Sequence, residues 1–391
     1  MSDKKNLKPG WKVWRFDQIA TNVNVRIDNP SESGMEHYIG LEHLDADSLK
    51  IRRWGSPDDV EATKLMFKKG DIIFGRRRAY QRKLGVAEFD GICSAHAMVL
   101  RAKPEVVLPE FLPFFMQSDL FMSRAVEISV GSLSPTINWK TMAVQEFALP
   151  PISRQAELIE ALRAMERVLE AQTTATEIGR ATRSALVEDV LAANFEPNVA
   201  KPLGTYLTDL SYGSSSRSAY AELGYPILRI PNVLRGSVDY SDLQRIELND
   251  VEYERLALRS GDVLLVRTNG NPQYVGRSVV IDHLHEKTVY ASYLIRIRCD
   301  ESKLRPAFLA EYLNAPSTRQ RLRGEVKSSA GNYNINIAGI KKQPICAPNV
   351  ADQDSLLLQL KDLDAAIEAL ESRTATSKST KKQLIAETWG A

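Results

Sequence analysis

Two loops at matching places in the chain carry side chains that suit contact with nucleic acid. The loop 76–83 consists mainly of cations, which bind phosphates and can hold guanine in a bidentate contact. The loop 267–274, with Arg277 shortly after it, is rich in asparagine and glutamine, which pair with adenine in the major groove. Each loop also keeps a tyrosine for stacking or for a phosphate hydrogen bond. The candidate contacts are Arg76, Arg77, Arg78, Tyr80, Gln81, Arg82 and Lys83 in the first loop, and Arg267, Thr268, Asn269, Asn271, Gln273, Tyr274 and Arg277 in the second.

Further candidates lie outside these loops. The aligned segments 131–140 and 331–336 precede long helical patterns, two polar residues occupy aligned places near 43 and 232, and the serine-rich stretch 212–217 suits a phosphate clamp in the second half only. Each has an ordinary alternative, because arginine-rich loops are often solvated surface, a segment before a helix can be a packed turn, and a lone histidine is often structural. These candidates are Ser134, Asn138, Lys140, Asn332, Tyr333, Asn334 and Asn336, then His43 and Asn232, and then Ser214, Ser215 and Arg217.

The loops occupy matching places because the chain repeats itself. Lys69–Arg76 (KGDIIFGR) returns as Ser260–Arg267 (SGDVLLVR), and the correspondence continues as far as Pro150 and Pro348. A repeat of this length predicts two similar globular units rather than a solenoid of short ones. Both copies place polar side chains between the same two glycines, which favours binding over simple solvation. Since the two loops have diverged, we expect the two copies to read different sequences.

Each copy combines short apolar runs with helical patches, which predicts an α+β fold. A Gly-Asp pair before an apolar run is typical of a turn that leads into a strand. The strand-like runs are 70–74, 97–100, 262–266 and 294–297, and the helical patches are 110–115 and 307–313.

A long helical pattern follows each mixed unit. Apolar residues recur there at steps of three and four, which is typical of a coiled coil. Since either helix alone would leave this stripe wet, we expect the two to pack antiparallel, with separate docking on other proteins as the alternative. About forty helical residues would span roughly 60 Å. The expected seam consists of Leu158, Leu162, Met165, Leu169 and Leu186, and of Leu356, Leu360, Leu363, Ile367, Leu370 and Leu384.

We therefore predict four segments. Residues 1–150 form the first mixed unit and 151–198 the first long helix. Residues 199–348 form the second mixed unit and 349–391 the second long helix.

Composition excludes several classes of protein. The net charge is only +2, but the mixed units are net positive and the helical segments net negative, as expected if the units contact nucleic acid. No apolar run approaches the roughly 20 residues of a membrane helix, and the start lacks a signal peptide, so we expect a cytoplasmic protein without membrane contact. Cys93, Cys299 and Cys346 stand far apart, which favours reduced thiols over disulfides or zinc.

The sequence carries no recognisable catalytic motif. It has no phosphate-binding loop, no amino-methyltransferase motif, no nuclease acid-x-Lys pattern and no helical His-x-x-x-His. We therefore expect no catalytic residue, no metal and no cofactor. The alternatives are a nuclease or methyltransferase with an unfamiliar motif, and a protein-binding adaptor that does not bind DNA.

Gly70–Phe74 and the run Leu149–Ile159 (LPPISRQAELI), with the duplication and a helix after each copy, together resemble the specificity subunit of Type I restriction–modification systems. The resemblance covers essentially the whole chain, although Ala347–Asn349 replaces Leu149–Pro151 in the second copy. It implies two target-recognition domains, each reading one half of a split, asymmetric DNA site, and two spacer helices. It also implies double-stranded DNA, two modification (methyltransferase) subunits and restriction (endonuclease) subunits as partners, with catalysis in those subunits.

Overall fold

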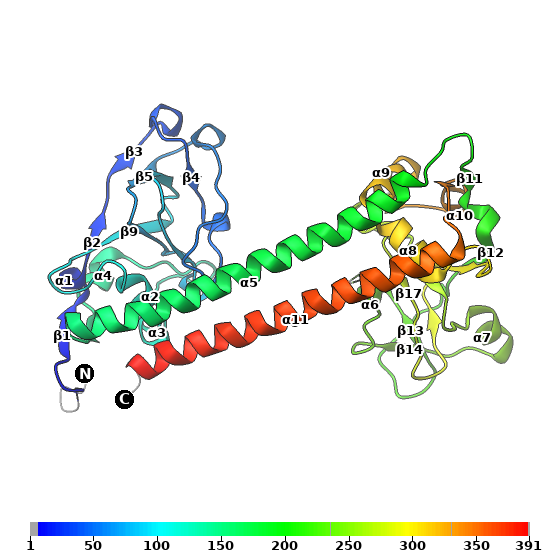
Figure 1. Cartoon of the computed structure of the whole chain (residues 1–391). Coiled ribbons are helices and arrows are strands. Elements are labelled where there is room, and N and C mark those ends of the chain that lie inside the picture. Colours follow the sequence, from blue (N-terminus) through cyan, green and yellow to red (C-terminus); the bar gives the residue numbers. More distant parts are fainter. Residues whose placement is uncertain (1–6, 235, 330, 390–391) are drawn as a thin grey trace. The chain divides into compact units, whose positions relative to one another are not determined.

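The computed structural model describes residues 7–234, 236–329 and 331–389. The chain divides into two units, the first comprising Met1–Thr173 with Ser372–Ala391 and the second Thr174–Glu371. Each unit holds one globular part and portions of two long helices, α5 (Ile152–Ala193) and α11 (Val350–Trp389), as Figure 1 shows.

The globular part of the first unit is built on two four-stranded sheets. One has the order β2 (Ala20–Val23), β9 (Ala97–Ala102), β6 (Ile72–Gly75) and β7 (Leu84–Val86), and the other β3 (Arg26–Ile27), β5 (Lys64–Phe67), β8 (Gly91–Cys93) and β4 (Tyr38–Ile39). A further pair joins β1 (Lys12–Arg15) to β10 (Glu146–Leu149). The helices are α1 (Phe16–Ile19), α2 (Leu112–Gln117), α3 (Asp119–Glu127) and α4 (Trp139–Ala143).

The second unit repeats this plan. Its main sheet has the order β12 (Leu207–Tyr212), β19 (Leu294–Cys299), β15 (Val263–Val266) and β17 (Ser278–Val280). Smaller sheets join β14 (Gln244–Ile246), β13 (Tyr225–Leu228) and β18 (Val289–Tyr290), then β16 (Thr268–Asn269), β21 (Asn332–Asn334) and β20 (Lys327–Ser329), and β11 (Lys201–Pro202) with β22 (Pro344–Ile345). The helices are α6 (Ile230–Val233), α7 (Asp250–Leu256), α8 (Pro306–Asn314), α9 (Pro316–Glu325) and α10 (Ile337–Lys341).

The repeated apolar run forms the central strand in each unit. In β6, Ile72 and Phe74 join the core beneath α2 and α3, whereas Ile73 joins the core between the two sheets. Such alternation follows from the two-residue period of a strand whose faces are both covered. In β15, Val263 and Leu265 face one core while Leu264 and Val266 face the other. The predicted α+β fold, its strands and its helical patches are confirmed.

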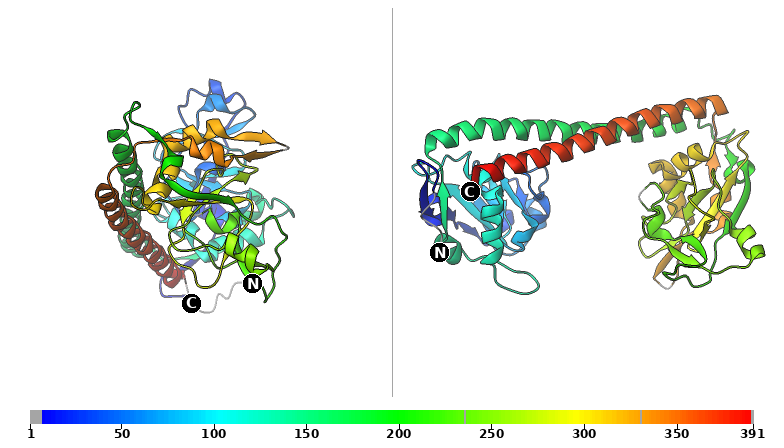
Figure 2. Two further views of the ribbon diagram at one scale, coloured as in Figure 1. Left: turned by 90° about the vertical axis from the view of Figure 1, so that its right-hand side faces the viewer. Right: turned by 90° about the horizontal axis from the view of Figure 1, so that it is seen from below.

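The two long helices pack antiparallel, as predicted. In the first unit the late residue Ile385 of α11 joins the core that contains Leu158 and Leu162 of α5. In the second unit Arg183, late in α5, forms an ion pair with Asp364 of α11, with 2.6 Å between Nε and Oδ1. The early part of one helix thus lies beside the late part of the other in both units. The views in Figure 2 agree with this direction.

The apolar stripe differs in part from the expected seam. Leu158 and Leu162 belong to the core of the first globular part, and Leu356 and Leu360 to that of the second. The stripe therefore docks each helix start onto its own unit as well as onto the other helix, a second role that the sequence reading did not assign. Ile367 is buried and lies against Gly179. The half-buried members are Met165, Leu169, Leu186, Leu363, Leu370 and Leu384.

A buried glutamine joins each helix to its globular part. Gln155 accepts a hydrogen bond from the Leu108 amide (2.8 Å) and donates to the carbonyls of Val106 (3.1 Å) and Pro150 (2.9 Å). Its side chain is completely buried. The helix start is therefore held by three main-chain hydrogen bonds.

The second unit contains the same joint. Gln353 accepts from the Arg305 amide (2.8 Å) and donates to the carbonyls of Lys303 (2.9 Å) and Pro348 (2.8 Å). The sequence pattern around the proline before each helix therefore marks a structural joint, which the sequence reading did not assign.

Candidate nucleic-acid interface

The repeated Gly-Asp turn positions the first candidate loop. Gly70 has a positive φ of 90°, which glycine adopts without strain. Asp71 is buried and accepts two hydrogen bonds from Arg101 (2.7 and 2.8 Å) and one from the Lys68 amide (2.9 Å). The turn therefore fixes β6, and the loop that starts at Arg76 leaves the end of that strand.

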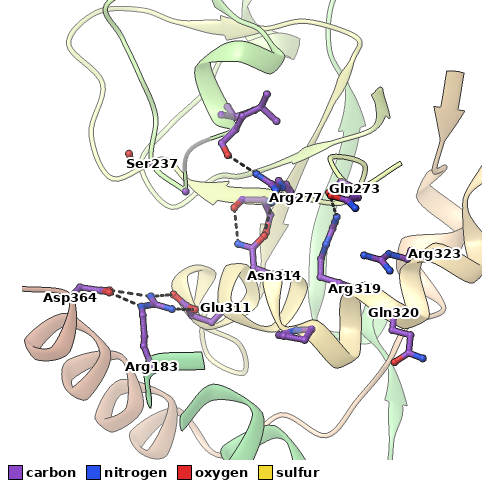
Figure 3. Close-up of a pocket in the computed structure, with 15 residues that line it drawn as sticks. Arg183, Ser237, Gln273, Arg277, Glu311, Asn314, Arg319, Gln320, Arg323 and Asp364 are labelled. Carbon is purple, nitrogen blue, oxygen red and sulfur yellow. Dashed lines mark hydrogen bonds and ion pairs between the residues drawn. The ribbon is translucent and has the colours of Figure 1, made fainter. Parts of the chain in front are cut away.

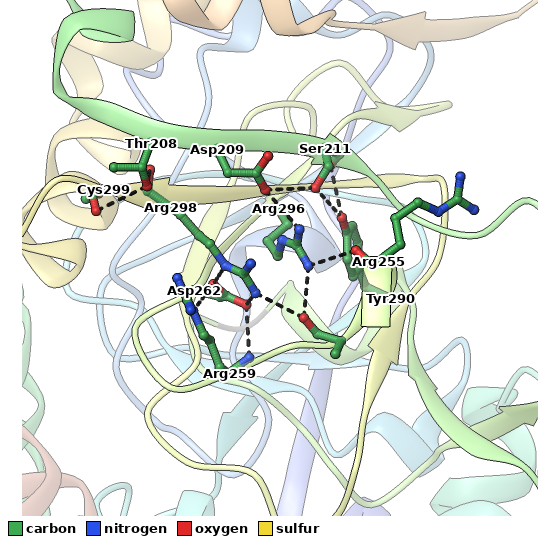
Figure 4. Close-up of polar contacts among 11 residues, drawn as sticks. Thr208, Asp209, Ser211, Arg255, Arg259, Asp262, Tyr290, Arg296, Arg298 and Cys299 are labelled. Atoms are coloured by element: carbon green, nitrogen blue, oxygen red, sulfur yellow. Dashed lines mark hydrogen bonds and ion pairs between the residues drawn. The ribbon is translucent and has the colours of Figure 1, made fainter. Parts of the chain in front are cut away.

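The second unit uses the same turn. Gly261 has a φ of 86°, and buried Asp262 accepts two hydrogen bonds from Arg298 (2.6 and 3.0 Å). These bonds raise the pKa of Arg298. Arg296, which is also labelled in Figure 4, donates to Asp209 (2.9 Å). Both carboxylates are thus committed to structural pairs rather than to catalysis.

In the first unit the loop after β6 lies against the segment before α4. The Ile137 amide donates to the Arg76 carbonyl (2.9 Å) and the Arg78 amide to the Pro135 carbonyl (2.7 Å). The Arg78 guanidinium also donates to the Ser134 hydroxyl (3.1 and 3.3 Å). Two candidate segments more than fifty residues apart therefore form one surface.

The equivalent segments meet in the second unit. The Ile335 amide donates to the Arg267 carbonyl (3.0 Å), which matches the bond between Ile137 and Arg76. Beyond it, β16 pairs with β21, with Thr268 opposite Asn334 and Asn269 opposite Tyr333. The duplication thus preserves the backbone of this surface while its side chains differ.

One arginine occupies the same place in both surfaces. Arg76 donates to the Ala95 carbonyl (3.0 Å), and Arg267 to the Ser292 carbonyl (3.3 Å). The buried Nε atom of each has no hydrogen-bond partner among the described residues. Arg267 also lies over the ring of Tyr212, 4.5 Å from its centre. Each guanidinium is held by one carbonyl and keeps hydrogen-bonding capacity.

A cavity of about 490 Å³ adjoins this arginine in the first unit. Arg76, Asn138 and Lys140 line it, as the sequence suggested for a binding surface. The reading of the sequence missed the other polar lining residues, of which Thr63 is one. Three more lie in the alternation Asn-Val-Asn-Val-Arg at 22–26, which would have indicated a strand with one polar face. These residues are Asn22, Asn24 and Arg26.

A histidine was also missed in the first unit. An Arg77 Nη1 lies 3.3 Å from His96 Nε2. Burial and the charges of Arg77 and Arg76 lower the pKa of His96. The imidazole is therefore uncharged at neutral pH, and the cationic character of this surface comes from arginine and lysine.

Three candidates of the first unit make structural contacts. Arg82 pairs with Asp47 (2.6 Å) and Asp119 (3.0 Å). Lys83 donates to the Leu41 carbonyl (2.7 Å). The His43 Nδ1 accepts from the Gly40 amide (3.0 Å) and so caps a short helical turn, Leu41–His43. We therefore omit Arg82, Lys83 and His43 from the proposed contacts.

Two candidates of the second unit are buried. Asn232 is 2% exposed, accepts from the Arg229 amide (2.9 Å) and caps α6, as His43 caps its own turn. Ser214 is also buried, and its hydroxyl accepts from the Ser216 amide (3.1 Å). Neither side chain is placed to reach DNA, and both are omitted.

The other candidates of the second unit lie at least partly at the surface. Asn269 and Asn271 accept hydrogen bonds from amides two residues later, and Asn336 caps α10. Arg277 lies 4.6 Å from the ring centre of Tyr274 and donates to a carbonyl. The exposed members are Ser215, Arg217, Asn271, Gln273, Asn332 and Asn336, and the half-buried ones Thr268, Asn269, Tyr274, Arg277, Tyr333 and Asn334. In the first unit Tyr80 is exposed and Gln81 half-buried.

The described residues contain no group of three or more His, Cys, Asp or Glu placed to hold a metal ion. The three cysteines are unpaired. Burial raises the pKa of Cys93, and that of Cys299 to about 12, so neither is a ready thiolate nucleophile. None of the helices in the described ranges combines the length and apolar composition that crossing a bilayer requires.

Comparison with known proteins finds relatives of one kind, all described as Type I specificity domains or subunits. Residues 30–178 match the Type I restriction modification DNA specificity domain. The chain is 28% identical to the specificity subunit of the Type I restriction enzyme EcoKI of Escherichia coli K12, over 94% of this chain and 85% of that protein. It is 22% identical to the StySPI specificity subunit of Salmonella potsdam, over 85% of this chain and 72% of that one.

Solved structures share the fold. A chain from a study of assembly and conformational transition of the type I R-M system aligns over 98% of both chains, with 20% identity and a TM-score of 0.62. The S subunit of a Type I restriction–modification system from M. genitalium aligns over 100% of this chain and 98% of its own, with 12% identity and a TM-score of 0.53.

Proposed function

Because the chain belongs to the family of Type I restriction–modification specificity subunits, we propose that it selects the DNA site at which such a complex acts. Each globular part, 1–150 and 199–348, reads one half of a bipartite, asymmetric sequence. The helical segments 151–198 and 349–391 set the unspecified spacer between the halves. The chain itself is non-catalytic.

One observation carries this proposal. In both units the loop after the Gly-Asp strand is joined to the segment before the next helix, through the bonds Ile137–Arg76 and Ile335–Arg267. The shared backbone presents different side chains, mainly arginine in the first unit and asparagine in the second. A surface that keeps its frame and changes its hydrogen-bonding groups is suited to reading different bases.

The two surfaces imply different half-sites. Arginine makes bidentate contacts with guanine, and asparagine or glutamine with adenine. Arg78, held by Ser134, and the exposed Asn332 represent the two kinds. We infer a half-site with guanine for the first unit and one with adenine for the second.

The partners follow from the same role. Two modification subunits supply methyl transfer and, in the full complex, restriction subunits supply cleavage, so the chain directs both activities to double-stranded DNA. This role places the chain in the cytoplasm, together with the DNA that it marks.

Methylation mapping tests the proposal. The full chain is expressed with its modification subunits, as wild type, Arg78→Ala or Asn332→Ala, and methylated sites are mapped across a genome. We expect each substitution to relax only one half of the site, with about 1–3 kcal/mol less discrimination at one position. The purified chain alone should transfer no methyl group, and its complex should bind DNA less tightly as salt rises.

Two results would contradict the proposal. One is methyl transfer by the isolated chain, which would make it an enzyme. The other is a methylation pattern that stays the same when this chain is exchanged for a relative with different loops. Relaxation of both halves by a single substitution would instead contradict the assignment of one half to each unit.

A further inference from the structure

A wide groove in the second unit adjoins the surface described above and shares Gln273 and Arg277 with it. It encloses about 1320 Å³ between α9, the stretch 273–278 and the turn after α6, with residues of the long helices on one wall (Figure 3). Pockets for small ligands usually hold roughly 300–1,000 Å³. The size of this groove favours a segment of a polymer over a small molecule.

Both acidic groups on the wall of the groove pair with one arginine, so this triad keeps one negative charge against the three further arginines of the groove. Arg183 bonds Glu311 with both terminal nitrogens (2.7 and 3.0 Å) and Asp364 through Nε (2.6 Å). Glu311 first, and then Asp364, raise the pKa of Arg183. No other carboxylate lines the groove among the described residues.

Three further arginines line the groove without a carboxylate partner among the described residues. Arg319 donates to the carbonyls of Val275 (2.5 Å) and Gln273 (2.6 Å), which orient its guanidinium without cancelling its charge. Arg277 donates to a carbonyl in the same way, and Arg323 is exposed. Burial, Arg277 and Arg323 lower the pKa of Arg319 to about 10. Arg319 is therefore still a cation at neutral pH, held among like charges.

A glycine makes room for this arrangement. Gly276 has a φ of 84°, and a Cβ atom there would lie 2.6 Å from a terminal nitrogen of Arg319. Because any larger residue would displace the guanidinium, the backbone at 276 is adapted to the position of Arg319.

The first unit lacks this cluster. With the shift that aligns Phe111 with Phe308, Arg319 and Arg323 correspond to Met122 and Val126. Met122 is buried in the apolar core of its unit. The fold therefore does not need cations at these two places, and their concentration in the second unit indicates a ligand of opposite charge.

We propose that this groove binds a backbone phosphate of DNA and anchors the second unit on its half-site without reading bases. The inference rests on the proposed function. The guanidinium group of arginine can donate two parallel hydrogen bonds to the oxygens of one phosphate. Phosphate contacts fix the position of a protein along the duplex but carry no sequence information directly. DNA is a polymer that fits a groove of this size, and under the proposed function it is the ligand of the chain.

The test exchanges the cluster for the residues of the first unit. Arg319→Met with Arg323→Val is made in the full chain, in complex with its modification subunits. Binding to a short duplex of arbitrary sequence, and to one with the mapped site, is measured at several salt concentrations. We expect a salt slope shallower by about 1, since the one lost phosphate contributes about 0.9, and affinity for both duplexes weaker by about 5–30-fold. The ratio between the two duplexes should not change.

Two further variants control for the general loss of charge and for misfolding. Arg255→Met with Arg259→Met removes the same charge from exposed positions of the unit and should leave the slope as in wild type. Arg323→Val alone changes an exposed side chain and should produce part of the effect in a folded protein.

Other outcomes would overturn the inference. They are an unchanged slope in the double variant, an equal loss in the control, or loss of subunit assembly with DNA binding intact, which would indicate an acidic protein surface as the occupant. Absence of DNA binding by the wild-type complex would overturn the proposed function as well, so the two failures differ.

Discussion

At the scale of residues, duplication separates structural side chains from those free to vary. Asp71 and Asp262 are both buried beneath an arginine, whereas Arg78 is replaced by Asn269 at the aligned place of the second loop. The residues that recur support the backbone, and those that differ lie where the backbone meets the solvent. Selection for new contacts can therefore act without disturbing the turn beneath them.

His96 gives a pH-dependent prediction. Its pKa is lowered in the folded chain, so the unfolded chain binds the proton more readily. The contribution of the neutral imidazole to stability is present above the ordinary pKa of about 6.5 and is lost as pH falls through that value to the folded pKa. We expect His96→Gln to lose less stability than wild type between pH 7.5 and pH 5, as measured by urea unfolding at each pH.

DNA binding should show the opposite sign at the same residue. A phosphate near Arg77 and His96 would favour the protonated imidazole, so affinity of the wild-type complex should rise as pH falls below about 6.5. The Gln variant should lack this rise. Equal pH dependence in the two proteins would place the phosphate away from His96.

At the scale of elements, the buried glutamines hold each long helix to its globular part. Gln353→Ala removes three hydrogen bonds and leaves Lys303, Arg305 and Pro348 with unsatisfied main-chain groups. We expect a loss of stability on the order of 3 kcal/mol for the second unit, with faster amide hydrogen exchange at the start of α11.

Gln359→Ala on the same helix is the matched control, because this glutamine is exposed. It should change stability by less than about 0.5 kcal/mol. A change in Gln353→Ala as small as that in this control would show that the three hydrogen bonds do not hold the joint.

Much of the architecture was predictable because it depends on periodicity. The apolar runs of β6 and β15 and the three-four spacing of the helices are local signals that tertiary packing reinforced. The candidate surface was harder to predict, because exposure depends on neighbours distant in sequence. In the sequence Arg82 resembles a DNA contact, and only the structure shows its ion pair with Asp119. Likewise, only the structure shows that Arg319 lies near Arg277 and so belongs to a cationic cluster.

At the scale of the whole molecule, the duplication extends to the ion pairs between the helices. Glu166 of α5 pairs with Lys381 of α11, and at the aligned places Asp364 of α11 pairs with Arg183 of α5. Lys381 is buried and also donates to Gln117 (2.5 Å). Each unit therefore contains a polar lock at the aligned place, and exchanging the two helices preserves this pair of locks. The second unit has a further ion pair between the helices, Arg180 with Glu371.

Shortening both helices tests their role as a spacer. Deleting 172–178 and 369–375 removes seven residues from each helix between the two aligned locks. It leaves both of these locks intact and removes Glu371, the partner of Arg180. Seven residues correspond to about 10 Å of helix and nearly two full turns, so the apolar faces stay aligned. We expect methylated sites with unchanged half-sites and a shorter spacer.

An unchanged spacer in the deletion variant would show that the helices do not set the distance. Deleting seven residues from α5 alone would bring the locks out of register and serves as the comparison. That variant should lose stability and methylation together.

The glutamine joints have a consequence for how such proteins diversify. The hydrogen bonds of the Gln155 and Gln353 side chains go to main-chain atoms of the globular part, and every residue except proline offers the same amide and carbonyl. Because the joint uses main-chain groups, a globular part of unrelated sequence can form the same hydrogen bonds, provided that its backbone follows the same path. Recombination at this joint therefore allows a globular part with a different DNA specificity to be attached to an unchanged long helix.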